Sequence, residues 1–174
     1  MKNSLQNMLS GKGGYSLIEM IIYVGILTLV SIVVLNLLFS FTQSYKTLAA
    51  LRAVEHSAID AMERMTREIR ASTAVVVAQS TFGSSPGVLT ISSNSSGISK
   101  TVKFYLDSGI LKMDIDGSYF GPLTSSNTTV SSLTFYNLTS TNSSAVKLDM
   151  TVSATVSDVT QTKIYHTTVV LKEK

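Results

Sequence analysis

The chain has 174 residues, of which 14% are charged, and its formal net charge is +3. A charged fraction so far below the usual ~25% predicts a segment that lies outside water. Lys and Arg are scattered rather than clustered, so no direct nucleic-acid binding is evident, because that function needs a basic patch. The absence of Cys excludes a disulfide framework, a thiolate metal site and a Cys nucleophile.

The N-terminal part consists of a polar leader followed by an apolar segment. Residues 1–14 include Lys2 and Lys12 and no acidic residue. Residues 17–41 are almost entirely apolar apart from Glu19, and about 20 such residues are enough to cross a bilayer. Because positive charge precedes the apolar segment, we expect a single-pass plasma (inner) membrane protein with a cytoplasmic N-terminus and an exported remainder.

The helical pattern continues beyond the apolar segment. No Pro occurs before residue 86, and apolar residues recur at spacings of three and four between residues 51 and 69. The sequence therefore predicts one helix from about residue 13 to residue 71, whose second half, 42–72, is amphipathic. Two pairs with the acid four residues before the base support a helix in water: Asp60 with Arg64, and Glu63 with Arg67.

Alternating patterns predict that residues 73–174 form a β-rich globular domain. Residues 101–106 and 111–115 alternate on either side of a turn at 107–109 and predict a hairpin with one apolar face. The longest alternation, residues 146–156, predicts a half-buried strand. Further strands are expected at 133–138, 163–171, 75–77 and 88–91, with loops at 80–87, 92–97, 124–129 and 139–144. The predicted fold class is α+β, with a long N-terminal helix packed against an antiparallel sheet.

The junction between leader and apolar segment carries a resemblance. A carboxylate four residues into an apolar segment is costly, and an interfacial position near the helix N-terminus is one way to satisfy Glu19. However, a short basic leader, Gly14, the aromatic Tyr15 and a Glu five residues after the Gly, followed by an apolar segment, together resemble the signal of type IV pilins and type II secretion pseudopilins. The later stretches MERMTREIRAS and TVKFYLDSGILKMDIDG resemble the larger minor subunits, of the minor pilin W or pseudopilin J type.

The resemblance implies a structural subunit of a filament, with a pilin-like fold. A prepilin peptidase would cleave between Gly14 and Tyr15, the new amine of Tyr15 would be methylated, and Glu19 would direct assembly. The transmembrane helix, 15–41, would form the core of an extracellular or periplasmic filament. The implied partners are other pilin or pseudopilin subunits, the peptidase, the inner-membrane assembly platform with its motor, and membrane lipid. Type IV pili, secretion pseudopili and DNA-uptake machines share this signal, so all three remain open.

Two alternatives to a filament subunit are an anchored binding domain and an exported enzyme. A single-pass membrane-anchored adhesin or binding domain would need neither Glu19 nor the Gly14–Tyr15 junction. An exported enzyme is not expected, because two distant histidines and no Cys provide no nucleophile, base and orienting group.

We interpret the possible metal ligands as residues with structural roles. His56 and Asp60 share one helix face at i,i+4, but two ligands do not make a zinc site. Asp114 and Asp116 before Gly117 resemble part of a calcium loop, although carboxylates that flank a turn usually stabilise the turn itself. His166 lies in an alternating strand and is expected to be structural. No metal or cofactor is therefore predicted.

Overall fold

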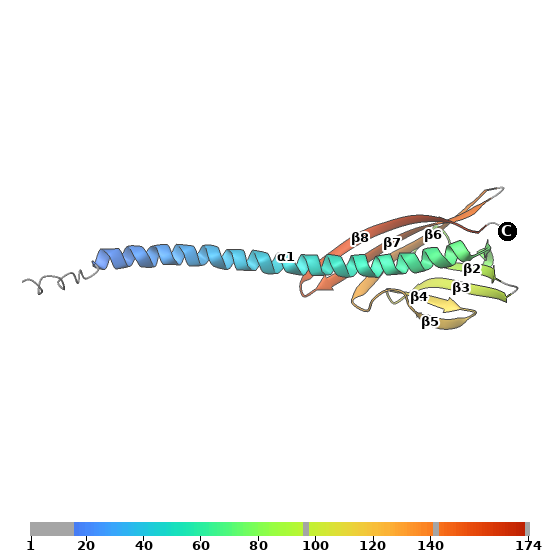
Figure 1. Ribbon diagram of the computed structural model, residues 1–174, viewed down its shortest axis with the longest axis horizontal. Helices are drawn as coiled ribbons and strands as arrows, with labels where there is room; N and C mark the ends of the chain where they lie inside the picture. The colour runs from blue at the N-terminus through green and yellow to red at the C-terminus, as the bar shows by residue number, and fades with distance from the viewer. Residues whose placement is uncertain (1–15, 96–97, 141–142, 173–174) are drawn as a thin grey trace, which may run out of the picture. The chain divides into compact units, whose positions relative to one another are not determined.

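The computed structural model describes residues 16–95, 98–140 and 143–172. Within these residues one long helix is followed by a series of antiparallel strands and a short 3₁₀ helix (Figure 1). This arrangement confirms the α+β class. The elements are α1 (Leu17–Ala71), β1 (Ala74–Val75), η1 (Val77–Gln79), β2 (Val88–Ser95), β3 (Ile98–Asp107), β4 (Ile110–Ile115), β5 (Ser118–Pro122), β6 (Thr128–Thr139), β7 (Ser144–Val156) and β8 (Val159–Val170).

Helix α1 is continuous over 55 residues, as the absence of Pro predicts. Of the two expected ion pairs, Glu63–Arg67 forms at 2.7 Å. The expected Asp60–Arg64 pair does not form. Arg64 instead pairs with Glu68 at 3.0 Å, and its guanidinium lies 5.4 Å from the ring centre of Phe120. In the sequence, Arg64 lies four residues from both Asp60 and Glu68. The structure pairs it with Glu68, on the side where its guanidinium contacts Phe120 of the sheet.

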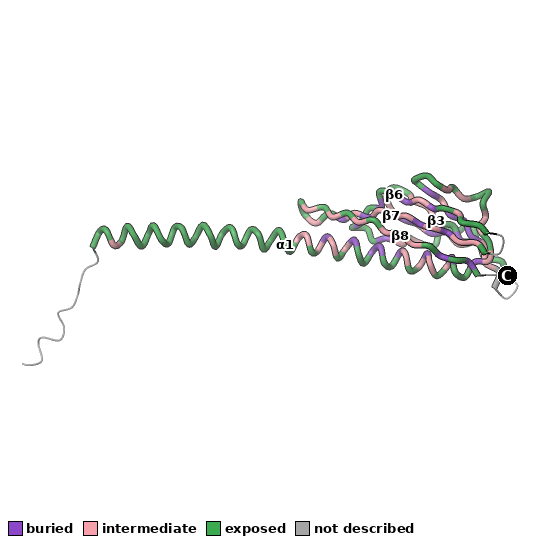
Figure 2. The backbone as a smooth tube through the Cα atoms, turned by 90° about the horizontal axis from the view of Figure 1, so that it is seen from above, coloured by how far each residue is buried: buried purple, intermediate pink, exposed green. Residues whose placement is uncertain are grey.

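The chain divides into two compact units, Met1–Gln43 and Ser44–Lys174. In the first unit the described helix residues are mostly exposed, whereas in the second the helix has a buried stripe (Figure 2). Small residues make up much of that stripe, so the larger side chains of the strands can pack against it. The buried residues of the helix are Ala50, Val54, Ser57, Ala58, Ala61, Met65 and Ile69.

The strands form two antiparallel sheets rather than the single sheet that was expected. One sheet has the order β1-β2-β3-β4-β5 and the other has the order β6-β7-β8. The predicted hairpin is present as β3 and β4, and the predicted long strand is β7. Strand β5 was not expected, and β2 extends through the expected loop at 92–97 as far as Ser95. Similarly, β6 begins at Thr128, inside the expected loop at 124–129.

A seam of hydrogen bonds joins the two sheets at β6. The Gly87 N–H donates to the Leu133 carbonyl at 2.8 Å, and the Val130 N–H donates to the Gly109 carbonyl at 2.8 Å. A Cβ at Gly109 would lie 2.8 Å from the side chain of Thr129. Residue 109 also has φ +78°, which L side chains rarely adopt. The close approach of the sheets at this point therefore requires glycine.

One hydrophobic core connects α1 with both sheets. It includes the fully buried Met65 of the helix, Phe104 of β3 and Phe135 of β6. The buried stripe of α1 therefore packs against faces of both sheets. The second unit is thus a helix that covers two sheets.

We expect the chain from about Gln43 onward to fold as an independent soluble unit, because the helix stripe and both sheet faces bury one another there. Circular dichroism should show both helix and strand content, and hydrogen exchange should show protection in α1 and β7. An unfolded fragment, or one with helix but no strand, would contradict this layout.

In that fragment, Met65→Ala should lower the free energy of unfolding by about 2–5 kcal/mol, because it opens a cavity beneath the helix. Urea denaturation measures the change. The matched control is Ile59→Ala on the same helix, where the side chain is 57% exposed. This control should change the free energy of unfolding by no more than about 0.5 kcal/mol. Equal effects of the two substitutions would refute the assignment of Met65 to the buried face of α1 and of Ile59 to the exposed face.

Candidate functional site

The predicted site lies at the N-terminal end of α1. Gly14 and Tyr15, the expected positions of cleavage and methylation, lie outside the described residues. Glu19 belongs to the first turn of α1, and its side chain is half-buried among exposed apolar neighbours. The adjacent Ile18 is 67% exposed and Ile22 is 54% exposed.

Glu19 has a partner that the sequence analysis did not identify. The hydroxyl of Tyr23 donates a hydrogen bond of 2.8 Å to Glu19 Oε1 from one turn further along the helix. Glu19 Oε2 accepts no hydrogen bond from the described residues. The signal was present in the sequence, because a Tyr at i+4 faces the same side of a helix. Among the described residues, the carboxylate is therefore oriented by a single hydrogen bond from its own helix.

Two hydroxyls of the apolar segment are satisfied within the helix. The hydroxyl of Thr28 donates to the Val24 carbonyl at 2.8 Å, and that of Ser31 donates to the Leu27 carbonyl at 2.8 Å. Such back-bonding allows a hydroxyl to lie in hydrocarbon without an unpaired donor. Glu19 differs from these hydroxyls, since an ionised carboxylate cannot be neutralised by one phenol.

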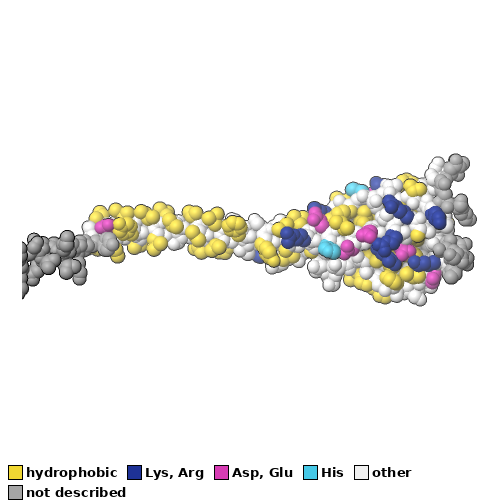
Figure 3. All heavy atoms as spheres, viewed as in Figure 1, with side chains coloured by type: hydrophobic (Ala, Val, Ile, Leu, Met, Phe, Trp, Pro, Cys, Tyr) yellow, Lys and Arg dark blue, Asp and Glu magenta, His cyan; other side chains and the backbone are white. Residues whose placement is uncertain are grey.

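The apolar segment fits a transmembrane helix. Its most apolar window has a mean hydropathy of 2.6, and none of that window is buried within the protein. Hydrophobic side chains cover most of the visible face of this part of α1 (Figure 3). An exposed apolar surface of this kind requires either lipid or protein around it. The length and composition are consistent with a single-pass anchor.

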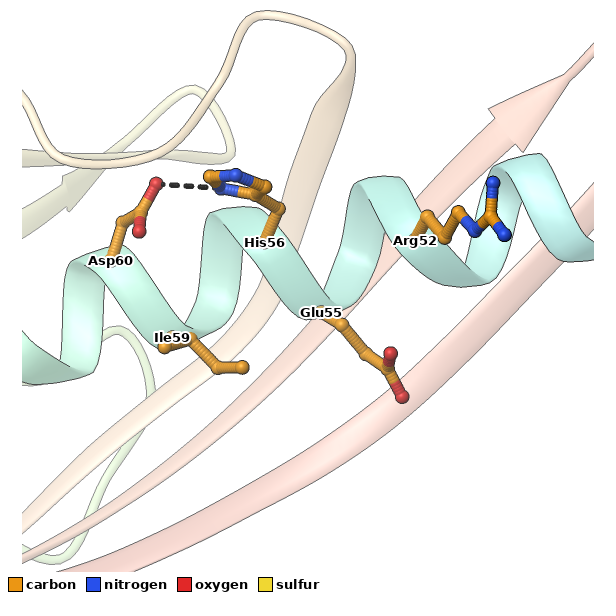
Figure 4. Close-up of a pocket in the computed structure, with 5 residues that line it drawn as sticks. All are labelled: Arg52, Glu55, His56, Ile59 and Asp60. Atoms are coloured by element: carbon orange, nitrogen blue, oxygen red, sulfur yellow. Dashed lines mark hydrogen bonds and ion pairs between the residues drawn. The ribbon is translucent and has the colours of Figure 1, made fainter.

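A shallow hollow of about 460 Å³ lies on the exposed face of the second half of α1. It is lined by Arg52, Glu55, His56, Ile59 and Asp60; in Figure 4, His56 and Asp60 project from one side of the helix, and Glu55 and Ile59 project from the other. The charged groups are mostly paired. His56 Nδ1 lies 2.9 Å from Asp60 Oδ2, while Glu55 forms an ion pair with Lys163 of β8.

The structure gives the other candidate ligands structural roles. Asp116 Oδ1 accepts a hydrogen bond from the backbone N–H of Thr101 at 2.7 Å, and Asp114 accepts one from the hydroxyl of Tyr105 at 3.1 Å. These two carboxylates therefore stabilise the β3–β4 pair. Within the described part of the chain, no three His, Cys, Asp or Glu side chains gather where they could hold a metal ion.

His166 pairs with Asp149 across the β7–β8 ladder at 2.7 Å. Burial would raise the pKa of Asp149, but hydrogen bonds from His166 and Lys147 outweigh it and hold this pKa below its usual range. A hydrogen bond to Glu55 raises the pKa of Lys163, on the side of the sheet that faces the helix. The His166–Asp149 pair joins β8 to β7, and the Lys163–Glu55 pair joins β8 to α1, as expected for structural ion pairs.

Comparison with known proteins gives no relative. No family model, curated protein or solved structure matches the chain.

Proposed function

We propose that the chain is a structural subunit, of the minor pilin or pseudopilin type, of a type IV pilus or type II secretion filament. The observation that carries the proposal is the carboxylate of Glu19, which accepts one hydrogen bond, from Tyr23, among the described residues and lies at the start of a long, exposed apolar helix. An anchored binding domain has no use for such a group. A filament subunit does, because a neighbouring chain can supply an opposite charge.

The proposed mechanism is assembly through charge pairing. Removal of residues 1–14 leaves the amine of Tyr15 at the head of the apolar helix, so each subunit carries one cation and one anion near hydrocarbon. An ionised group there costs a few kcal/mol, and an opposite charge can offset that cost. When helices pack in parallel with a stagger, Glu19 Oε2 of an incoming subunit can meet the Tyr15 amine of its neighbour. Other registers leave both charges unpaired.

Tyr23 has a positioning role in this proposal. Its hydrogen bond to Glu19 Oε1 fixes the rotamer of the carboxylate before the neighbour arrives, which reduces the entropy lost on pairing. Before assembly, while the subunit is in the membrane, the Tyr23 hydroxyl also provides a hydrogen-bond donor for Glu19 Oε1. The subunit would perform no chemistry of its own and needs no cofactor.

Leader removal provides the first test. A Gly14→Leu variant should remain full length when it is expressed with a prepilin peptidase, because the residue before the cut would no longer fit the enzyme. The wild-type chain should lose residues 1–14 as one piece and keep its apolar helix, whereas signal peptidase I cuts after the apolar stretch. Intact-mass measurement distinguishes these products. Normal loss of residues 1–14 from the variant would contradict the proposal.

The second test concerns Glu19. Glu19→Ala should be inserted and cleaved normally, yet its level in filaments should fall on the order of tenfold or more, since loss of a pair worth over ~1.4 kcal/mol has that effect. Glu19→Lys should be more severe because it places two cations together, and Glu19→Asp should be intermediate. Tyr23→Phe is the matched control for the neighbouring side chain and should reduce incorporation less than Glu19→Ala.

Sheared filaments and membranes should be recovered separately and blotted for each variant. If Glu19→Ala reaches filaments at the wild-type level, the pairing mechanism is wrong and Glu19 is only an interfacial residue.

A further inference from the structure

The turn between β7 and β8, formed by Ser157 and Asp158, is tied to the first part of the folded helix. Asp158 Oδ1 accepts a hydrogen bond from Lys46 Nζ at 2.6 Å. This hydrogen bond lowers the pKa of Asp158, so the carboxylate is ionised at neutral pH and the contact is an ion pair. In Figures 1 and 2, β7 and β8 run beside α1 as far as this turn.

The turn contacts α1 nearer to the apolar segment than the loop before β6 does. The β7–β8 ladder extends two pairs beyond the start of β6 at Thr128. The loop before β6 contacts the helix at Ser57, whose hydroxyl oxygen accepts a hydrogen bond from the Ser125 N–H at 3.1 Å. Ser57 follows Lys46 by eleven positions, which is about 16 Å along a helix.

The apolar segment ends shortly before Lys46. No charged residue lies between Glu19 and Lys46. A hydrocarbon core of about 30 Å needs roughly 20 helical residues, so a core that begins at Glu19 ends close to Phe41. Tyr45, which is 73% exposed, follows within one turn, and Tyr is enriched at the boundary between hydrocarbon and headgroups.

The length of chain between Phe41 and Lys46 places the turn at the level of the headgroups. Both residues belong to α1, and five positions correspond to about 7.5 Å along a helix. The headgroup layer on each side of a bilayer is roughly 5–8 Å thick. Lys46, and with it Asp158, therefore lies within or just above this layer. This conclusion holds whatever angle the folded unit makes with the apolar segment.

The surface of the turn is polar and balanced in charge. Its exposed residues are Thr155, Ser157, Asp158 and Thr160. Hydroxyl groups can donate hydrogen bonds to phosphate oxygens and accept them from ammonium groups. Because Lys46 neutralises Asp158, a zwitterionic phospholipid surface does not repel the turn.

We propose that the β7–β8 turn contacts phospholipid headgroups on the side of the bilayer where the folded unit lies. The contact rests on the membrane anchor and not on the filament assignment. The Lys46–Asp158 ion pair has a positioning role, since it holds the turn against the part of α1 that leaves the hydrocarbon. An ion pair in the headgroup layer is also stronger than one in bulk water, because the effective dielectric constant is lower there.

Fluorescence quenching of the full chain in phosphatidylcholine vesicles tests the contact. The chain has no native Cys, so one introduced Cys carries the only thiol-linked fluorophore. Ser157→Cys reports on the turn, and Thr139→Cys is the matched control, since both positions are exposed and carry a hydroxyl in the native chain. The quencher is attached to the lipid headgroup.

The control position lies at the opposite end of the folded unit. Thr139 pairs with Ser144 at the end of the β6–β7 ladder. The Ser144 carbonyl accepts a hydrogen bond from the Leu171 N–H, and the next residue donates to the carbonyl of Ser72, just past the end of α1. This end of α1 is roughly 40 Å along the helix from Lys46.

The headgroup quencher should cause a loss of fluorescence at residue 157 and not at residue 139. Insertion of seven polar, helix-forming residues after Gln43 moves the turn about 10 Å further from the hydrocarbon and keeps the helix face. Quenching at residue 157 should then be lost. Absence of quenching at residue 157, equal quenching at the two positions, or quenching that the insertion leaves unchanged would overturn the proposal.

A third label distinguishes failure of the contact from failure of the anchor. Val33→Cys lies within the apolar segment and should be quenched from the lipid acyl chains. Quenching at residue 33 without quenching at residue 157 would mean that the anchor stands and the turn contact is wrong. Absence of quenching at residue 33 would overturn both. The vesicles contain no assembly machinery, so a missing turn contact leaves the filament assignment to the Glu19 variants.

Discussion

The packing of one helix against two sheets is the constraint on which the folded unit depends. Each sheet has a single apolar face, and in the core both faces meet the stripe that runs from Ala50 to Ile69 on α1. Without the helix, neither sheet could bury that face fully. The small side chains of Ala58 and Ala61 are fully buried in the same core as Met65 and Phe104, so a larger side chain at either position would overpack it.

The same helix meets a different constraint before Gln43. There the backbone groups are bonded within the helix, and the hydroxyls of Thr28 and Ser31 return to carbonyls one turn earlier. These two hydroxyls therefore need no partner from a non-aqueous surrounding. Glu19 is different, because its carboxylate accepts one hydrogen bond from the phenol of Tyr23 and keeps an oxygen for which the described residues provide no donor. Orientation by Tyr23 makes the group available in a defined direction.

Most of the secondary structure could be predicted because the periodic signals were long. The helix had no Pro to interrupt it, and β7 alternated over its whole length. Strand β5 was not predicted because Ser118–Pro122 is short, has two adjacent exposed aromatic residues rather than an alternating pattern, and ends in Pro. Alternation also reveals only which face of a strand is buried and not which strand lies beside it. The division into two sheets therefore could not be read from the sequence.

The candidate site was predicted in part. Glu19 was identified from its cost in an apolar segment, but its partner Tyr23 was not, although the i,i+4 spacing allows the hydrogen bond. Likewise, Asp60 and Arg64 had the right spacing for an ion pair, but Asp60 pairs with His56 of the same helix, and Arg64 pairs with Glu68 and lies over Phe120. Local spacing defines the possible partners, and tertiary contacts decide among them.

The seam at β6 has a consequence for how this chain can evolve. At Gly87 a Cβ would lie 3.0 Å from the Leu133 carbonyl oxygen, and at Gly109 it would meet Thr129 at 2.8 Å. Each glycine is therefore restricted by the close approach of the two sheets, whereas many Ser and Thr side chains on the outer faces of the strands are exposed. Mutational drift should accordingly alter the outer surface freely while these two positions stay unchanged. A family descended from such a chain could diversify what it displays while its internal frame remains constant.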